Sequence, residues 1–277
     1  MGNAYEERLG TDRMLPLIFK MSLPAVAAQL VNLLYNIVDR IYIGHIPGIG
    51  TDALAGIGVT SAVIVLISSF SAIVGAGGSP LAAIALGRGN RERAGQILGN
   101  GFILLLIFTI LTSATTYLFM EPILLFTGAS ENTIGYATDY LSIYLLGTLF
   151  VELSVGLNTF INTQGRPTIA MYSVLIGAIL NIGLDPLFIF TFGMGVKGAA
   201  LATILSQACS AIWVISFLTS KKASLRLEYR YMKLHKGIIL SILALGVSPF
   251  IMASTESLVG FVLNSSWKNL EISMSVH

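Results

Sequence analysis

The chain has 277 residues, of which 55% are hydrophobic and 11% are charged, and its formal net charge is only +2. Soluble domains carry about 25% charged residues, so this composition and the mean hydropathy of +0.81 exclude an ordinary soluble domain and a disordered chain. The single cysteine excludes an intramolecular disulfide scaffold and a thiolate metal cluster. The sequence therefore predicts an all-α, polytopic membrane protein.

The first 14 residues are polar and lack the apolar core of a signal peptide, so we expect residues 1–14 to form a cytoplasmic tail. Seven stretches then reach the length of about 20 apolar residues that a spanning helix needs, and none alternates like a barrel strand. The second has 34 residues, and the segment Gly-Ala-Gly-Gly-Ser-Pro at 75–80 predicts that its helix ends, kinks or is re-routed there. The predicted spans are 15–43, 53–86, 94–119, 134–162, 168–190, 196–218 and 238–262.

Lysine and arginine are distributed unevenly between the two sides of these spans. Thirteen lie in the N-terminal segment or in the loops after the second, fourth and sixth spans, against three on the other side. This bias predicts a plasma-membrane protein with a cytoplasmic N-terminus, and seven spans then place the C-terminus outside. The thirteen are Arg8, Arg13, Lys20, Arg88, Arg91, Arg93, Arg166, Lys221, Lys222, Arg226, Arg230, Lys233 and Lys236; the three are Arg40, Lys197 and Lys268.

A weak internal repeat predicts the domain organisation. A shift of 225 residues places Pro24 on Pro249 and Asp39 on Asn264, and many transporters are built from such repeats. Two copies would need about 450 residues, so we expect a second copy that is truncated after one helix. The basic segment 219–236 between the sixth and seventh spans is also expected to contact anionic lipids. The expected parts are the tail at 1–14, a six-helix lobe at 15–218, a basic cytoplasmic linker at 219–236, the first helix of a second lobe at 237–264 and an irregular tail at 265–277.

Four of the acidic residues inside the predicted spans are candidates for a functional role. A charge in the middle of a spanning helix costs at least about 2.5 kcal/mol, so we expect each acid to face the bundle interior or a watery cavity. Glu152 is expected near the end of its helix. The four are Asp39, Glu152, Asp185 and Glu256.

Amide and hydroxyl side chains share helical faces in these spans because they follow one another at spacings of three or four residues. Two carboxylates with such oxygens suit a hard cation such as sodium, or a proton that the two acids share. If Asp39 and Asp185 approach each other, their titrations are coupled. The alternative is that these groups only join neighbouring helices by hydrogen bonds. The groups are Gln29, Asn32 and Asn36 with Asp39, Asn181 with Asp185, Thr203 with Gln207, and Asn158 with Asn162.

The sequence contains no recognisable set of catalytic residues. His45, His235 and His277 lie in loops or at the terminus, and no serine, histidine and aspartate set is evident. The segment Gly-Arg-Gly-Asn-Arg at 87–91 lacks the Lys-Ser/Thr pair of a phosphate-binding loop and is interpreted as a cytoplasmic turn. We therefore expect that the protein is not an enzyme and that it binds neither a cofactor nor a nucleic acid.

Several motifs, taken together and in order, carry a family resemblance. They are Pro24, Asn36, Asp39-Arg40 and Ile43-Gly44 in the first span, Gln-Gly-Arg-Pro at 164–167, Asn-Ile-Gly-Leu-Asp-Pro at 181–186, and Gly-Val-Lys-Gly-Ala-Ala-Leu-Ala-Thr at 195–203. From about residue 15 to residue 264 the chain resembles the multidrug and toxic compound extrusion (MATE) family of transporters. The resemblance implies a twelve-helix fold in two lobes, which expels organic cations and amphipathic drugs in exchange for sodium ions or protons.

The resemblance also implies site residues for the coupling ion, Na⁺ or H⁺, and for the substrate cavity. Because only one helix of the second lobe is present, we expect the chain to lack half of the drug-binding wall and to need a complementary C-terminal lobe or a second copy. The implied cation-binding residues are Asp39, Asn158, Asn181, Asp185 and Thr203. The expected cavity lining is Gln29, Tyr35, Asn36, Gln207 and Glu256.

The expected function is multidrug efflux by antiport, with membrane lipids and small-molecule drugs as partners. Three alternatives stay open from the sequence. The chain could be a flippase for a lipid-linked amphipathic substrate, or an inactive membrane fragment that needs a partner lobe. A membrane-embedded enzyme is the third, and the missing nucleophile–base or metal set counts against it.

Overall fold

The computed structural model describes residues 14–275, except for the side chains of residues 14, 16, 17, 20, 21 and 263–275. Every regular element in this part is helical, which confirms the predicted all-α class. The long helices are α2 (Met14–Gly44), α3 (Gly50–Gly87), α4 (Arg91–Leu118), α6 (Ile134–Thr163), α7 (Pro167–Pro186), α8 (Val196–Thr219) and α9 (Lys236–Ser275). Shorter elements are α5 (Met120–Phe126), a π-helical turn (Leu187–Thr191) and a 3₁₀ turn (Tyr229–Tyr231).

Six of the described helical segments are long and apolar enough to cross a membrane, and they coincide with six of the seven predicted spans. They are Gly50–Gly87, Arg91–Leu118, Ile134–Thr163, Pro167–Thr191, Val196–Thr219 and Lys236–Val262. The remaining predicted span, 15–43, is helical as α2 but is not among the six, and several side chains in its first turns lie outside the described residues. The predicted tail at 1–14 lies outside the described residues apart from Met14.

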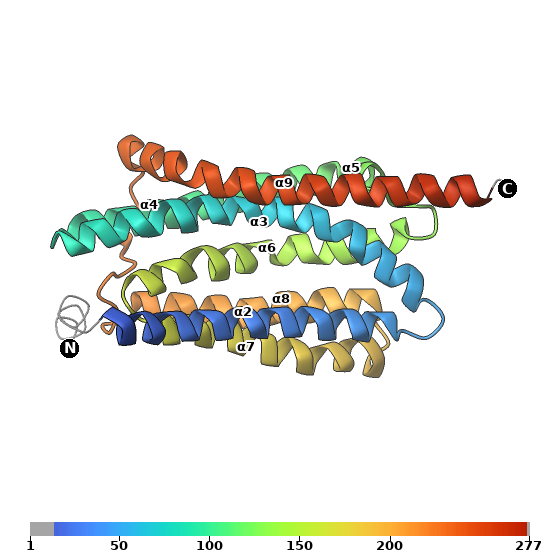
Figure 1. The fold of residues 1–277 in the computed structure, drawn as a ribbon, viewed down its shortest axis with the longest axis horizontal. Helices are drawn as coiled ribbons and strands as arrows, with labels where there is room; N and C mark the ends of the chain where they lie inside the picture. Colours follow the sequence, from blue (N-terminus) through green and yellow to red (C-terminus); the bar gives the residue numbers. More distant parts are fainter. Residues whose placement is uncertain (1–13, 276–277) are drawn as a thin grey trace.

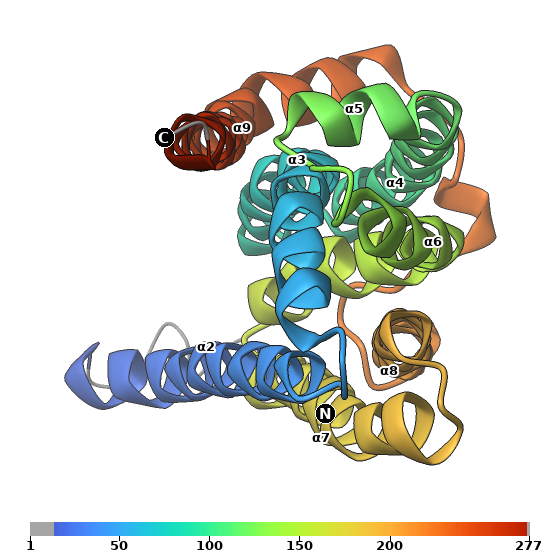
Figure 2. The same cartoon turned by 90° about the vertical axis from the view of Figure 1, so that its right-hand side faces the viewer.

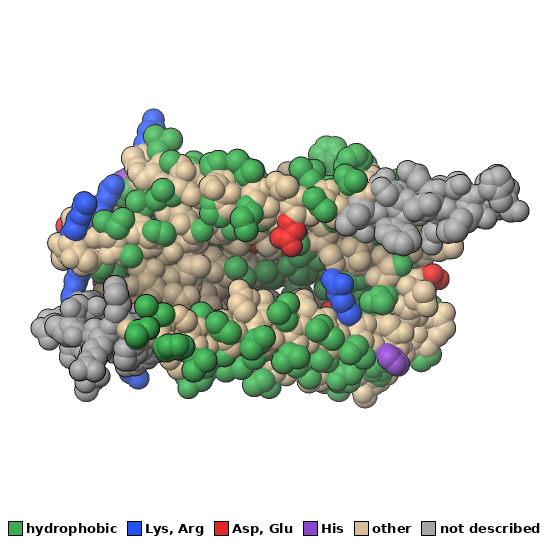
Figure 3. Space-filling view, viewed as in Figure 1, with side chains coloured by type: hydrophobic (Ala, Val, Ile, Leu, Met, Phe, Trp, Pro, Cys, Tyr) green, Lys and Arg blue, Asp and Glu red, His purple; other side chains and the backbone are tan. Residues whose placement is uncertain are grey.

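The helices lie side by side along the long axis of the molecule (Figure 1). Seen end-on, α3, α4, α5 and α9 form one layer and α2, α7 and α8 form the other (Figure 2). Helix α6 lies between them and packs against both α3 and α8. Large apolar side chains remain exposed along the outer surface, as in proteins that face lipid (Figure 3).

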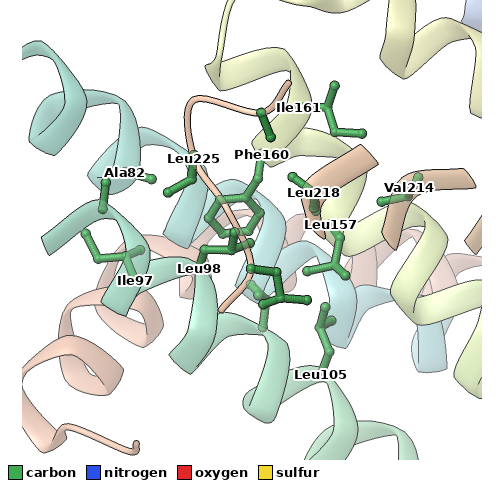
Figure 4. Close-up of a cluster of buried hydrophobic side chains, with 14 of the residues drawn as sticks. Ala82, Ile97, Leu98, Leu105, Leu157, Phe160, Ile161, Val214, Leu218 and Leu225 are labelled. Carbon is green, nitrogen blue, oxygen red and sulfur yellow. The ribbon is translucent and has the colours of Figure 1, made fainter. Parts of the chain in front are cut away.

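The largest core cluster holds this arrangement together around Phe160 of α6, which is completely buried (Figure 4). Leu98 and Leu105 of α4 and Leu218 of α8 are equally inaccessible in the same cluster. A Cβ atom at Gly78 of α3 would lie 2.7 Å from the Phe160 ring, so α3 approaches α6 as closely as only a glycine permits. Such close contacts stabilise membrane helices because lipid leaves little hydrophobic driving force between them.

Helix α3 does not end at 75–80, since it continues unbroken from Gly50 to Gly87 with Pro80 inside it. Its glycines serve packing instead. A side chain on Gly77 would clash with the backbone of Ile242 and Gly246 in α9, and one on Gly246 would clash with Ile73. The small residues therefore allow α9 to lie directly along α3.

The C-terminal part differs from expectation in one element. Helix α9 continues to Ser275, so most of the tail predicted to be irregular at 265–277 is helical. No glycine or proline occurs between residues 261 and 275 to interrupt it. The rest of the predicted domain division stays a prediction.

Candidate cation site

Asp39 lies close to the end of α2, at the contact with α7. Its carboxyl group interacts with that of Asp185, which lies near the end of α7 and is completely buried. Oδ1 of Asp39 and Oδ2 of Asp185 are buried and accept no hydrogen bond within the described part of the chain. Two acids that are distant in sequence thus form a pair inside the bundle.

Asn181 connects this pair to α8. Its Nδ2 donates to Oδ1 of Asp185 at 3.3 Å, one turn further along α7, and makes a longer contact of 3.5 Å with Oγ1 of Thr203. The Thr203 hydroxyl donates to the carbonyl of Ala199 at 3.0 Å, which leaves its oxygen lone pairs free to accept. Pro186 has no N–H, and α7 ends there in a π-helical turn. Helices α2, α7 and α8 therefore converge on one polar site.

The converging atoms are mainly oxygens. Besides the two acids, Asn181 keeps a buried Oδ1 without a partner. Neither acid forms an ion pair with a lysine or arginine among the described residues. Two adjacent carboxylates repel each other when both are charged. The arrangement suits a hard cation or a proton, because either removes this repulsion.

The chemistry differs from that of a transition-metal site. In the part of the chain that the structure describes, no group of three or more His, Cys, Asp or Glu side chains comes together. Amide and hydroxyl oxygens, from Asn181 and Thr203, are the additional groups beside the acids. Oxygen donors of this kind bind hard cations rather than soft ones.

A cavity of about 280 Å³ lies between α2, α6, α7 and α8. Gln29, Tyr35 and Gln207 border it, as does Asn158. Gln207 accepts a hydrogen bond of 2.7 Å from Ser154, so its side chain is fixed between α8 and α6. Three of the five residues predicted to line a cavity therefore share this one.

No hydrogen bond among the described residues joins three other predicted site residues to the acid pair. Asn158 donates to the carbonyl of Ala170 at 3.2 Å, and no hydrogen bond joins it to the acid pair. Asn36 is exposed and donates to the carbonyl of Asn32, and it does not border the cavity. Glu256 is exposed on α9, on the opposite layer of the bundle. Helical spacing identifies a shared face, but it does not determine which part of that face meets a neighbouring helix.

Two buried tyrosines of α6 were not anticipated. Tyr140 and Tyr144 stack with ring centroids 6.2 Å apart. The Tyr140 hydroxyl lies beside the Thr203 hydroxyl, within electrostatic reach of Asp39. Their spacing of four residues was visible in the sequence, but tyrosine in an apolar helix is too common to mark a site.

Glu152 is a further buried acid, separate from the pair. It lies in the middle of α6 rather than near a helix end, is 1% exposed and has Ser71 of α3 as a neighbour. Neither of its carboxyl oxygens has a hydrogen-bond partner among the described residues. The expectation that Glu152 lies near a helix end is therefore wrong.

The MatE family model matches residues 24–187, which are more than half of the chain. The multidrug export protein MepA of Staphylococcus haemolyticus (strain JCSC1435) is 28% identical over 243 residues, covering 88% of this chain and 53% of that protein. MepA of Staphylococcus aureus (strain MSSA476) is 26% identical over 243 residues, with the same shares covered. The chain spans about half the length of the curated relatives that it matches.

Solved structures agree with the family match. One is described as the inward-facing conformation of a multidrug resistance MATE family transporter of the MOP superfamily; its TM-score is 0.79 at 27% identity, over 90% of this chain and 56% of that one. The outward-facing conformation of such a transporter has a TM-score of 0.82 at 28% identity, over 90% and 55%. These proteins are named as transporters or export proteins, not as enzymes. The predicted resemblance is confirmed: the chain, a multi-pass membrane protein, belongs to the MatE family.

Proposed function

We propose that this chain supplies the ion-coupling lobe of a multidrug efflux antiporter, which exports organic cations or amphipathic drugs in exchange for Na⁺ or H⁺. The observation that carries the proposal is the pair of Asp39 and Asp185, in which each acid keeps one buried oxygen without a hydrogen-bond partner and neither forms an ion pair with a described lysine or arginine. The name of the MepA relatives, multidrug export proteins, supports the substrate class.

The mechanism follows from the charge of this pair. A cation or proton that enters from outside neutralises the acids and removes their repulsion. Helix α2 packs mainly against α7 and lies at the edge of its layer, so it is the element with the fewest restraints on a shift (Figure 2). A shift of α2, or a bend near Pro24, then lowers the affinity of the drug site and opens it outward. Ion release to the cytoplasm resets the lobe.

Coupling requires that ion and drug bind the two states with different affinities. Polar residues on α2, α6 and α8 border a cavity, and Asp39 lies one helical turn after the lining residue Tyr35 on α2, so movement of α2 changes both regions. The rest of the drug cleft comes, in this proposal, from a second lobe or a second copy of the chain. We place the chain in the plasma membrane with its N-terminus in the cytoplasm, because basic residues predominate on the N-terminal side of the membrane.

Cation-dependent efflux of a fluorescent organic cation tests the proposal in cells that produce the chain extended by a second lobe. We expect Asp39→Asn and Asp185→Asn each to reduce ion-driven efflux by roughly tenfold or more, because a single remaining acid no longer changes charge with the ion in the same way.

Asp139→Asn is the matched control. Asp139 is half-exposed and pairs with Lys197 at a distance of 3.3 Å, and neither residue belongs to the candidate cation site. This variant is expected to pump normally. Normal efflux by both site variants would remove the basis of the proposal.

A further inference from the structure

A second polar feature lies at the end of the bundle where the basic residues gather (Figure 3). It is a pocket of about 810 Å³ between the start of α4, the residue before α7 and the segment that joins α8 to α9. None of the residues of the candidate cation site borders it. Its lining includes six basic side chains and a single acid: Arg91, Arg166, Lys221, Lys222, Arg226 and Arg230, with Glu228.

The segment that forms this pocket is anchored to the core and is not a loose linker. Leu225 and Leu227 are buried in the largest core cluster, and the Leu225 N–H donates to Oε1 of Gln164 at 3.0 Å. Asn100 of α4 binds the segment twice, since it donates to the carbonyl of Lys233 at 3.0 Å and accepts from the His235 N–H at 2.7 Å. The basic side chains are therefore presented from a fixed wall.

Tyr231 adds a second anchor. Side chains at Gly95 or Gly99 of α4 would clash with Tyr231, so these glycines make room for it against the helix. Arg230 lies over the Tyr231 ring at 4.6 Å, which orients its guanidinium at the rim of the pocket.

The charges in the pocket are not balanced from within. Glu228, the acid of the lining, is engaged by Arg230 at 2.6 Å. Arg226 donates from Nη2 to the carbonyl of Thr219 at 3.4 Å, but its buried Nε has no acceptor among the described residues. A buried charged donor without a partner is costly, and an anion in the pocket would satisfy it.

We propose that this pocket is a binding site for a phosphate group. Arginine presents a planar fork of donors that matches phosphate oxygens, and lysine adds point charges. A concave site lined by charges of one sign concentrates the opposite ion. The phosphate belongs either to the headgroup of an anionic phospholipid at the membrane surface or to a small soluble molecule. This goes beyond a diffuse contact between basic loops and lipid, because it requires particular residues.

Thermal unfolding of the purified 277-residue chain in neutral detergent tests the site. The probes are short-chain phosphatidylglycerol, inorganic phosphate and, as the zwitterionic comparison, short-chain phosphatidylcholine. We expect an anionic probe to raise Tm with concentration. Arg226→Gln should weaken binding by roughly tenfold. The double variant Lys221→Gln/Lys222→Gln, at two exposed positions, tests the pocket independently if Arg226→Gln does not fold.

The matched control is Arg88→Gln/Arg93→Gln, which removes two exposed basic residues that do not border the pocket. If phosphatidylglycerol binds and only the pocket variants weaken it, the source is a lipid. If inorganic phosphate alone gives the same pattern, the source is soluble. Either outcome supports the site. The proposal fails if no anionic probe raises Tm, or if the control variant loses as much binding as the pocket variants.

Discussion

Glu152 and Asp185 are buried acids and Asp39 is a partly buried one, but the surroundings of Glu152 differ from those of the pair of Asp39 and Asp185. The pair has Asn181 and Thr203 beside it, which supply further oxygens for a cation. Glu152 has Ser71 of α3 as a neighbour and Tyr144 of its own helix within electrostatic reach, and the Ser71 hydroxyl already donates to the carbonyl of Ser68 at 2.7 Å. One acid with so few oxygen ligands does not build a cation site.

This difference predicts the effect of Glu152→Gln. An ionised carboxylate without a partner in the interior costs several kcal/mol, and glutamine has nearly the same shape without the charge. We therefore expect the thermal stability of the chain to stay unchanged or to rise. Glu228→Gln, which removes a partly exposed partner of Arg230, should lower stability by at most about 1 kcal/mol. A loss above about 2 kcal/mol for Glu152→Gln would show that this acid has an essential partner.

At the scale of whole helices, close contact between α3 and α9 depends on glycines. Gly246 has no room for a Cβ atom against Ile73, whereas a Cβ at Gly58 of α3 meets nothing within 4 Å. Replacement of a helical glycine by alanine favours the helix by about 1 kcal/mol in both cases. We expect Gly246→Ala to lose about 1–3 kcal/mol through overpacking and Gly58→Ala to be neutral or stabilising. Thermal unfolding measures both, and equal behaviour of the two variants would contradict the packing argument.

Hydropathy predicted the spans at 53–86 and 238–262 because apolar length is visible in sequence, but it did not predict how they pack. Residues 75–80 suggest a helix break in the sequence, because glycine and proline commonly interrupt helices. In the structure, α3 stays helical through these residues, and its glycines make room for α6 and α9. The short helix α5 was missed for a related reason, since its seven residues are too few for a periodic pattern.

The site shows the same division between local and long-range information. Asn181 and Asp185 were predictable as neighbours because they lie one turn apart on α7. The approach of Asp39 was a hypothesis, since it depends on how α2 packs against α7. Tyr140 was missed because its role depends on the packing of α6 against α8, which brings it to Thr203.

For the whole molecule, the four residues that come together belong to α2, α7 and α8, all within this chain. Ion binding should therefore not require the remaining half that the longer relatives have, whereas drug transport should. If Na⁺ is the coupling ion, it should raise the Tm of the purified chain by mass action, an effect of about 2.7 kcal/mol at a concentration of 100 times Kd. The effect should grow as pH rises, because protons and Na⁺ compete for the same carboxylates.

Asp185→Asn should abolish this Na⁺ effect, and Asp139→Asn, at a half-exposed ion pair, should preserve it. Potassium at the same ionic strength controls for screening. If protons are the coupling ion instead, Na⁺ should have no effect beyond that of K⁺. The stability of the chain should then fall as the pH rises through the range in which the pair loses its shared proton, because the two charged acids repel each other. In that case Asp185→Asn removes the fall. A chain whose stability responds neither to Na⁺ nor to pH through Asp185 would have no coupling site at this pair, whatever its second lobe contributes.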